Sequence, residues 1–425
     1  MSITEKRDKR LLVFICAGAY FASYLTRVNY KAVLSEIIAS EGFAKSEAAA
    51  ALTGLFITYG IGQLISGWLG DRINPKYLMC SGLVLASAMN FILPLRQSTA
   101  WMTVIWCVNG FGQALMWPPI VKTLSAYLSD DGFIRATVRV SWGSNLATIL
   151  LYLGCPVMIG AAGWKSVFGV CGAVGLAAAA ALFVLYSKIE KKYGKSVSRP
   201  AQKEIQPAET AERPKYTPFI AALLGGVLLI IILQGILRDG IDTWMPSYVS
   251  EVFSLSTKIS ILSGVVLPIF TVLSYEAARI IFSKVLRSEM FCGAVFFIFC
   301  AVCSALLLAA RNASPVISVL LFALAVGSTH GVNQVMTCFV PGRFKKFGNI
   351  STISGVTNFA TYVGSALSTY AFASITENSG WNATVVSWVV IAAAGAAVCL
   401  VLFFPWRRFL VKYHSSGAGN NENSN

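Results

Sequence analysis

Long apolar stretches separated by short polar segments dominate this chain. A helix needs about 20 apolar residues to cross the hydrocarbon core of a bilayer, and twelve stretches meet that length: near residues 11–35, 48–70, 77–95, 101–127, 133–161, 165–187, 217–250, 259–283, 290–310, 315–340, 350–375 and 382–405. The pattern predicts an all-α membrane protein with twelve transmembrane helices.

The composition supports this fold class. Of the 425 residues, 56% are hydrophobic and only 12% are charged, which is outside the range of soluble domains. All ten cysteines lie in predicted spans, and the single CxxC pair, Cys300 and Cys303, has no histidine or carboxylate nearby. Small apolar filler is therefore favoured over metal or redox chemistry. Because the sequence shows no nucleotide-binding loop or catalytic triad, we predict neither enzyme activity nor a cofactor.

The net charge of +15 follows a pattern along the chain. Lysine and arginine gather at both termini and in alternate loops, and the opposite loops carry only Lys45, Arg96, Lys165, Lys258 and Arg311. The positive-inside rule then places both termini in the cytoplasm of a cell bounded by an inner or plasma membrane. This alternation argues against nucleic-acid binding, for which basic residues would cluster on one surface.

The sequence repeats itself on either side of a basic segment at 188–216. Arg27 pairs with Arg238, Gly132–Ser141 with Gly342–Ser351, and Gly163-Trp164 with Gly380-Trp381. We therefore expect two six-helix bundles at 1–187 and 217–410, a cytoplasmic linker at 188–216 and a cytoplasmic tail at 411–425. Parallel repeats of this kind build transporters whose site lies near the bilayer midplane.

A charged motif ends the second predicted span, Gly67-Trp68-Leu69-Gly70-Asp71-Arg72-Ile73-Asn74-Pro75-Lys76. It resembles the signature G-x-L-x-D-R-x-x-x-[RK] of the major facilitator superfamily. The resemblance implies that Asp71, Arg72 and Lys76 take part in conformational switching. The alternative is an ordinary interfacial charge cluster. The second half has only a degraded counterpart in Glu276 and Arg279.

Arg27 and Arg238 each lie inside a long apolar stretch. A charge at membrane depth costs at least about 2.5–3.5 kcal/mol and usually faces a substrate pathway. Tyr20, Tyr24, Arg27 and Lys31 share one helical face. A guanidinium binds two phosphate oxygens at once and keeps its charge, so these residues predict an anion site. Tyrosines of the membrane interface are the alternative for Tyr20 and Tyr24.

Three segments narrow the resemblance to the organophosphate:phosphate antiporters, which include glycerol-3-phosphate and hexose-phosphate transporters. They are Tyr20-x-x-x-Tyr24-Leu25-x-Arg27-x-Asn29, Leu237-Arg238-x-Gly240-Ile241-x-x-Trp244-x-Pro246-x-Tyr248, and Gly112-x-x-x-x-Trp117-Pro118-Pro119 followed by Lys122. The resemblance implies that Arg27 and Arg238 form the phosphate-binding pair, with Tyr20, Tyr24 and Lys122 in the same site.

The chain departs from the glycerol-3-phosphate transporters at two places. Gln63 stands where they have a lysine, and the fifth span has no histidine around Trp142–Asn145. His330 could replace that histidine as a proton-sensitive anion ligand, or it could be a neutral histidine bonded within the bundle.

Other polar residues of the spans also leave alternatives open. Asp239 and Asp242 could couple transport to protons, or could hold Arg238 in an ion pair that weakens when phosphate arrives. Asn358, Thr361 and Ser365 on the eleventh span, and Asn145 on the fifth, could meet substrate hydroxyls or join helices.

These observations predict a monomeric secondary transporter of a small organophosphate, a sugar phosphate or glycerol phosphate, exchanged for inorganic phosphate by alternating access. Two other functions remain open. One is a proton-coupled symporter of carboxylates or other organic anions, and the second is a transporter-like sensor of sugar phosphates.

Overall fold

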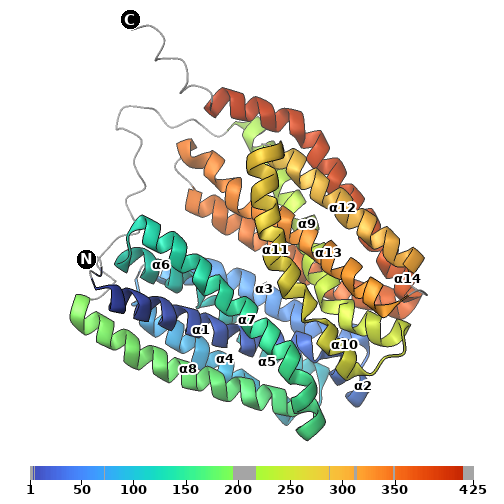
Figure 1. The fold of residues 1–425 in the computed structure, drawn as a ribbon, viewed down its shortest axis with the longest axis horizontal. Helices are drawn as coiled ribbons and strands as arrows, with labels where there is room; N and C mark the ends of the chain where they lie inside the picture. Colours follow the sequence, from blue (N-terminus) through green and yellow to red (C-terminus); the bar gives the residue numbers. More distant parts are fainter. Residues whose placement is uncertain are drawn as a thin grey trace, which may run out of the picture. The chain divides into compact units, whose positions relative to one another are not determined.

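The computed structural model describes residues 3, 5–70, 72–194, 217–286, 288–310, 314–347 and 350–414, and every regular element among them is a helix (Figure 1). The helices are α1 (Lys6–Ala32), α2 (Leu34–Glu41), α3 (Lys45–Gly70), α4 (Pro75–Ile92), η1 (Leu93–Leu95), α5 (Thr99–Ala114), α6 (Trp117–Tyr127), α7 (Asp130–Ala162), α8 (Trp164–Tyr193), α9 (Pro218–Val252), α10 (Thr257–Ser263), α11 (Val266–Ile280), η3 (Ile281–Leu286), α12 (Glu289–Ala310), α13 (Pro315–Asn333), η4 (Gln334–Phe339), η5 (Pro341–Phe347) and α14 (Ile350–His414).

Eleven helical stretches among the described residues are long and apolar enough to cross a membrane. The last of them, Ile353–Tyr413, is more than twice the length needed for one crossing. It consists of two helices that meet at Gly380, which has φ 76° and ψ 176°. Counting these two separately gives twelve crossings, so the predicted all-α, twelve-helix fold is confirmed.

The same glycine conformation occurs in both halves of the chain. Gly163, between α7 and α8, has φ 72° and ψ 174°, which closely matches Gly380. This region of the Ramachandran map is open to glycine almost alone. The repeat seen in the sequence therefore reflects a shared backbone turn, in which a glycine reverses the chain and a tryptophan begins the next helix.

Several boundaries differ from the sequence prediction. The fourth span is divided into α5 and α6, because Pro118 and Pro119 suit the first turn of a new helix. Helix α8 continues to Tyr193, into the predicted linker, and residues 195–216 of that linker lie outside the described residues. Helix α14 continues to His414, into the predicted tail.

The chain forms two compact units that do not coincide with its two sequence halves. Unit 1 contains α1 to α8 together with Thr243–Ile269 and Thr369–Asn378. Unit 2 contains α9 up to Asp242, Phe270–Ser368 and the chain from Ser379 onward. The boundaries between units therefore fall inside α9, α11 and α14.

Polar contacts hold the late segments of unit 1 to its first helices. Lys45 Nζ lies 2.7 Å from Glu251 Oε2 at the end of α9. The backbone N–H of Ser46, in the first turn of α3, donates to Glu377 Oε1 at 3.0 Å. Both carboxylates lie beside the amino-terminal end of α3, where the helix dipole favours negative charge.

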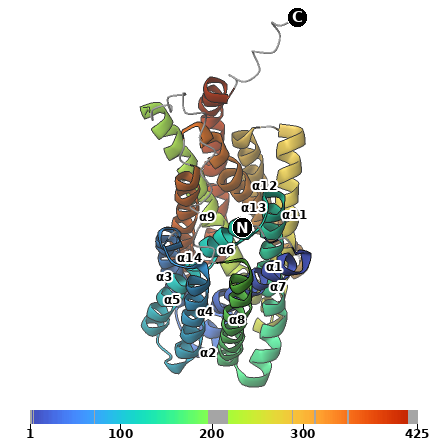
Figure 2. The ribbon, with the colours of Figure 1, turned by 90° about the vertical axis from the view of Figure 1, so that its left-hand side faces the viewer.

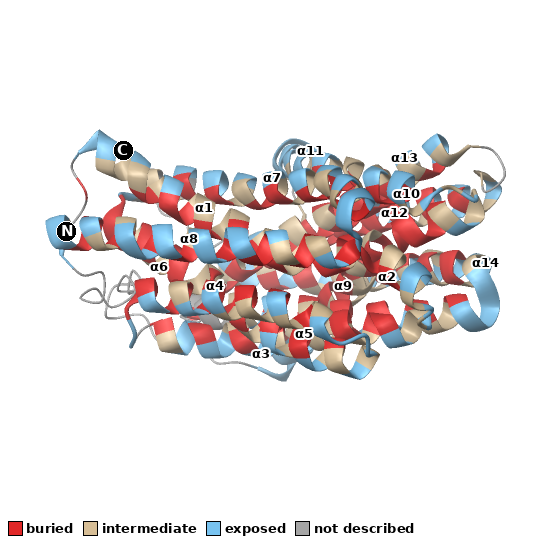
Figure 3. Cartoon of the chain, turned by 90° about the horizontal axis from the view of Figure 1, so that it is seen from below, coloured by how far each residue is buried: buried red, intermediate tan, exposed pale blue. Residues whose placement is uncertain are grey.

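Within unit 1, α1 packs against α7 and α8, α4 against α8, and α3 against α5 (Figure 2). Buried and exposed stretches alternate along α1 and α8 (Figure 3). The exposed face of α8 is itself apolar and includes Val170, Val174, Phe183 and Val184. Such a face suits contact with lipid rather than water.

We predict that Gly163→Ala and Gly380→Ala each destabilise the protein by about 1–3 kcal/mol, because a Cβ disfavours their backbone conformation. The measurement is the thermal unfolding midpoint of each purified variant in detergent. Gly169→Ala is the matched control, since Gly169 is helical and an added Cβ would meet no atom within 4 Å. An unchanged midpoint in both test variants would contradict the shared-turn interpretation.

Candidate functional site

A buried network of amide side chains fixes α1 directly beside Arg27. The backbone carbonyl of Thr26 accepts hydrogen bonds from Asn90 Nδ2 on α4 and Asn109 Nδ2 on α5, both at 2.9 Å. Gln113 Nε2 donates to Thr26 Oγ1 at 3.0 Å, and all four residues are at most 1% exposed. A helical carbonyl has a second lone pair for such bonds. These hydrogen bonds therefore fix the rotation of α1 and its position along its own axis at Thr26, the residue before Arg27.

Aromatic rings surround the Arg27 guanidinium. Its Cζ lies 4.3 Å from the ring centre of Tyr59 on α3 and 5.3 Å from that of Tyr24. Tyr24 packs at 5.0 Å against Tyr20, whose ring lies 5.1 Å from Trp117 on α6. The structure thus brings Tyr20, Tyr24 and Arg27 together, as predicted. Cation–π contacts of this kind contribute about 0.5–2 kcal/mol each.

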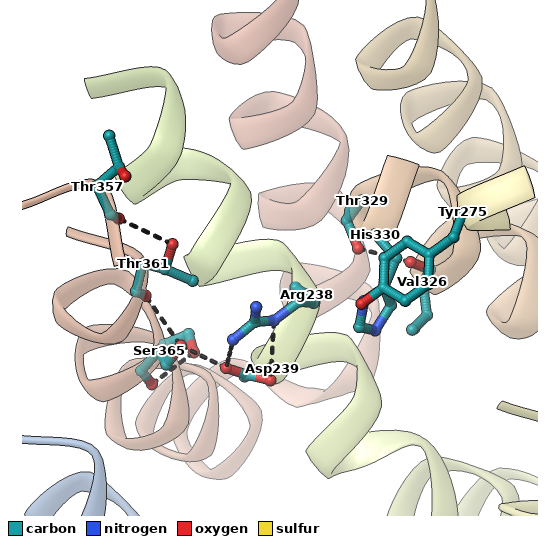
Figure 4. Close-up of polar contacts among 10 residues, drawn as sticks. Arg238, Asp239, Tyr275, Val326, Thr329, His330, Thr357, Thr361 and Ser365 are labelled. Atoms are coloured by element: carbon teal, nitrogen blue, oxygen red, sulfur yellow. Dashed lines mark hydrogen bonds and ion pairs between the residues drawn. The ribbon is translucent and has the colours of Figure 1, made fainter. Parts of the chain in front are cut away.

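Arg238 pairs with the carboxylate of the next residue on α9 (Figure 4). Its Nη2 lies 2.6 Å from Asp239 Oδ2, and its Nε donates to Asp239 Oδ1 at 3.2 Å. Ser365 Oγ on α14 donates to Asp239 Oδ2, and the Tyr362 ring centre lies 6.0 Å from Arg238 Cζ. Of the two interpretations of the acids after Arg238, the structure shows an ion pair, which Asp239 makes.

Close packing of α9 against α14 brings Ser365 within reach of Asp239. A Cβ added to Gly235 would collide with the backbone carbonyl of Thr361, and one added to Gly364 would collide with that of Ile232. Glycine permits this backbone approach between membrane helices.

Polar side chains follow α14 on the same face. Thr361 Oγ1 donates to the Thr357 carbonyl at 3.2 Å, and Ser365 Oγ lies 2.9 Å from the Thr361 carbonyl (Figure 4). The predicted residues Thr361 and Ser365 are therefore buried near Arg238, whereas Asn358 is exposed.

His330 on α13 lies against Tyr275 on α11 (Figure 4). The phenol oxygen is 3.2 Å from His330 Nδ1, and the two rings meet edge to face with centres 5.6 Å apart. This contact ties two helices of unit 2 together, as expected for a histidine bonded within the bundle.

Lys122 lies at a different level from Arg27. It donates from α6 to the Gly70 carbonyl at the end of α3. Tyr59 and Gly70 are about three turns apart along α3, so this contact of Lys122 lies at the charged motif.

The charged motif itself divides into two environments. Arg72 is exposed and stacks on the Trp68 ring, with Cζ 3.8 Å from the ring centre, and Asp71 lies outside the described residues. Lys76 is buried, with Nζ 2.7 Å from Glu190 Oε2 at the end of α8. Lys76 therefore joins α4 to α8 inside the amino-terminal half.

A second buried acid occupies the corresponding place in unit 2. Glu289, the first residue of α12, is 0% exposed and accepts from Trp406 Nε1 on α14 at 2.9 Å. Its other oxygen lies 2.5 Å from Arg343 Nε. Each half thus holds one carboxylate where its third and sixth spans meet. Glu276 and Arg279, by contrast, form a pair on the surface.

Sequence reasoning missed Tyr59, Tyr275, Tyr362, Glu190 and Glu289. Each was visible as a polar side chain within or at the end of an apolar stretch. Tyr59 also lies one turn before Gln63, on the same face of α3. The partners of these residues are remote in sequence, so their roles could be recognised only in the folded chain.

The described residues therefore form membrane-spanning bundles in which the repeat-related Arg27 and Arg238 are partly buried. The chain belongs to the Major Facilitator Superfamily, whose family model matches residues 16–369. It is a multi-pass membrane protein and a secondary transporter, not an enzyme. The fold agrees with a bacterial homologue of the human lysosomal transporter Spinster in an inward-facing, unoccupied conformation, with a TM-score of 0.73 and 13% identity over 95% of this chain and 99% of that one.

Distant relatives support the resemblance to the organophosphate transporters. A probable hexose phosphate transport protein of Chlamydia muridarum is 29% identical over 36% of this chain and 34% of its own length. The glycerol-3-phosphate transporter of Bacillus subtilis is 31% identical over 37% of each chain. The membrane sensor protein UhpC of Escherichia coli is 28% identical over 40% of this chain and 38% of its own. The chain matches little more than a third of these relatives' length.

We predict that Glu190→Gln and Lys76→Met each destabilise the protein by about 3 kcal/mol, because each leaves one polar partner of a buried ion pair uncompensated. The double variant should lose less than the sum of the two. The measurement is thermal unfolding in detergent.

Lys192→Met is the control for this experiment. Lys192 also lies on α8 and pairs with Glu5 and Asp8, but its side chain is 47% exposed, so its loss should change the unfolding midpoint much less than the loss of Lys76. Additive losses in the Lys76 and Glu190 variants would show that the pair does not hold α4 to α8.

Proposed function

We propose that this transporter exchanges a small organophosphate for inorganic phosphate across an inner or plasma membrane, with both termini in the cytoplasm. The observation that carries the proposal is the pair of repeat-related arginines, Arg27 and Arg238, each half-buried among aromatic and polar groups. Cations at membrane depth usually mark the pathway of a substrate or an ion. The names of the distant relatives, which include hexose phosphate and glycerol 3-phosphate, support a phosphoryl group as that anion.

In this proposal both guanidinium groups act on the phosphoryl group of the substrate. Tyr20, Tyr24 and Tyr59 shape the Arg27 side of the site, and Tyr362 and Asn358 lie on the other half. The free energy of substrate binding then lowers the barrier to the conformational switch of alternating access. The transporter switches back only when a second anion is bound. Four charged residues take part in the conformational switch at the helix ends, where charged loops rearrange: Lys122, Asp71, Arg72 and Lys76.

A sensor of sugar phosphates is the second candidate, favoured by the similarity to a membrane sensor protein of Escherichia coli. A proton-coupled symporter of carboxylates is the third, favoured by the carboxylate beside Arg238. A sensor would bind its ligand without flux, and a symporter would need no phosphate on the opposite side.

Counterflow in proteoliposomes tests the proposal. Vesicles loaded with inorganic phosphate should take up labelled phosphate, and external glycerol 3-phosphate or hexose phosphates should compete. Arg27→Lys and Arg238→Lys should each reduce exchange at least about tenfold, because lysine cannot form the bidentate contact.

Arg279→Lys serves as the control, since Arg279 is 59% exposed and pairs with Glu276 on the surface. If phosphate exchange survives both test substitutions, or if carboxylates compete and organophosphates do not, the antiport proposal is wrong.

We further propose that His330 contributes to anion binding and makes exchange depend on pH. His330→Gln should then flatten the pH profile of phosphate exchange between pH 5 and 8 while the protein remains folded. Tyr275→Phe, which removes only the hydroxyl facing His330, separates loss of the imidazole from loss of their contact. An unchanged profile in His330→Gln would assign the histidine a purely structural role.

A further inference from the structure

The carboxylate of Asp239 occupies the edge of Arg238 that an oxyanion would use. Nε and Nη2 of the guanidinium both point at it, at 3.2 and 2.6 Å. These two donors form one of the forks with which arginine binds carboxylate or phosphate bidentately.

This pairing is not what helix geometry gives by default. Side chains at neighbouring positions of a helix do not face one another, so the Arg238 side chain must turn toward Asp239. Ser365 Oγ on α14 donates to Asp239 Oδ2, the same oxygen that Arg238 Nη2 contacts (Figure 4). The Arg238 and Asp239 side chains are 12% and 15% exposed. The ion pair and the hydroxyl that holds it thus involve three residues on two helices.

The related arginine in the first half has a different neighbour. Val28 follows Arg27 where Asp239 follows Arg238. The rings of Tyr24 and Tyr59 lie on the Arg27 guanidinium. An acid directly after the repeat-related arginine is therefore found in the carboxyl-terminal half and not in the amino-terminal half.

We propose that Asp239 is a built-in counter-anion that competes with the transported anion for Arg238. The inference rests on the proposed role of Arg238 in anion binding. The arriving anion takes over the Nε and Nη2 donors from the carboxylate, and the carboxylate returns to them when the anion leaves. Asp239 lowers affinity and speeds release, so the site neither retains its substrate nor holds an uncompensated cation.

A purely positioning role makes the opposite prediction. If Asp239 only aimed the guanidinium at the substrate, its loss would weaken anion binding. The sign of the change in affinity therefore separates the two roles.

The test measures thermal stabilisation of the purified protein by inorganic phosphate, sulfate and succinate, each titrated to give an apparent Kd. Asp239→Asn keeps the shape and the acceptor for Ser365 but removes the charge. We expect its Kd for the anion that binds wild-type protein to fall about tenfold, equivalent to about 1.4 kcal/mol. In phosphate exchange, KM and the maximum rate should both fall, because release becomes slower.

Glu276→Gln controls for the loss of one negative charge, since Glu276 pairs with Arg279 on the surface of the same unit. Its Kd should not change. Ser365→Ala provides a second test with Asp239 still charged, and it guards against a folding defect in Asp239→Asn. Loosening the carboxylate should again lower Kd.

The outcomes separate this inference from the proposed function. If phosphate does not bind wild-type protein but sulfate or succinate does, organophosphate exchange is wrong, and the Kd ratio for that anion still tests Asp239. If phosphate binds and both variants have an equal or higher Kd, the counter-anion role of Asp239 is wrong, whereas the proposal of organophosphate exchange still stands. If no anion stabilises any of the proteins, the counter-anion role of Asp239 and the proposal of organophosphate exchange are both wrong.

Discussion

The charges of Arg27 and Arg238 are the constraint on which the arrangement of this molecule depends. A guanidinium cannot lose its proton in a protein, so each apolar bundle must compensate a permanent cation. The rings of Tyr24 and Tyr59 lie on the Arg27 guanidinium. The Arg238 guanidinium is paired with Asp239, which Ser365 holds.

Much of the surrounding polar structure serves to hold these cations in place. The amides of Asn90 and Asn109 fix the Thr26 carbonyl beside Arg27. The close approach of α9 and α14 at Gly235 and Gly364 puts Ser365 against Asp239. Buried amides and close glycine contacts resist sliding between helices, because any shift leaves a donor unsatisfied or a backbone in collision. Each arginine is therefore held in a rigid setting within its own unit.

The two halves share a backbone plan but differ in chemistry. Gly163 and Gly380 make the same turn, and each half buries one carboxylate, Glu190 or Glu289, between its third and sixth spans. The paired cation differs, since Lys76 is buried with Glu190 whereas Arg343 is one-third exposed. The repeat thus fixes positions for polar groups and leaves their identity free to vary.

The sequence alone determined the fold class, because the length of each apolar stretch and the alternation of charge between loops are local properties of the sequence. It also located Arg27, Arg238, Tyr20 and Tyr24, since charged and polar residues in an apolar stretch are visible without a structure. Tertiary structure decided the partners: Asp239 for Arg238, Glu190 for Lys76, and the Gly70 carbonyl for Lys122. These pairings depend on which helix faces which, and on side-chain directions at neighbouring positions. The linear pattern does not contain that information.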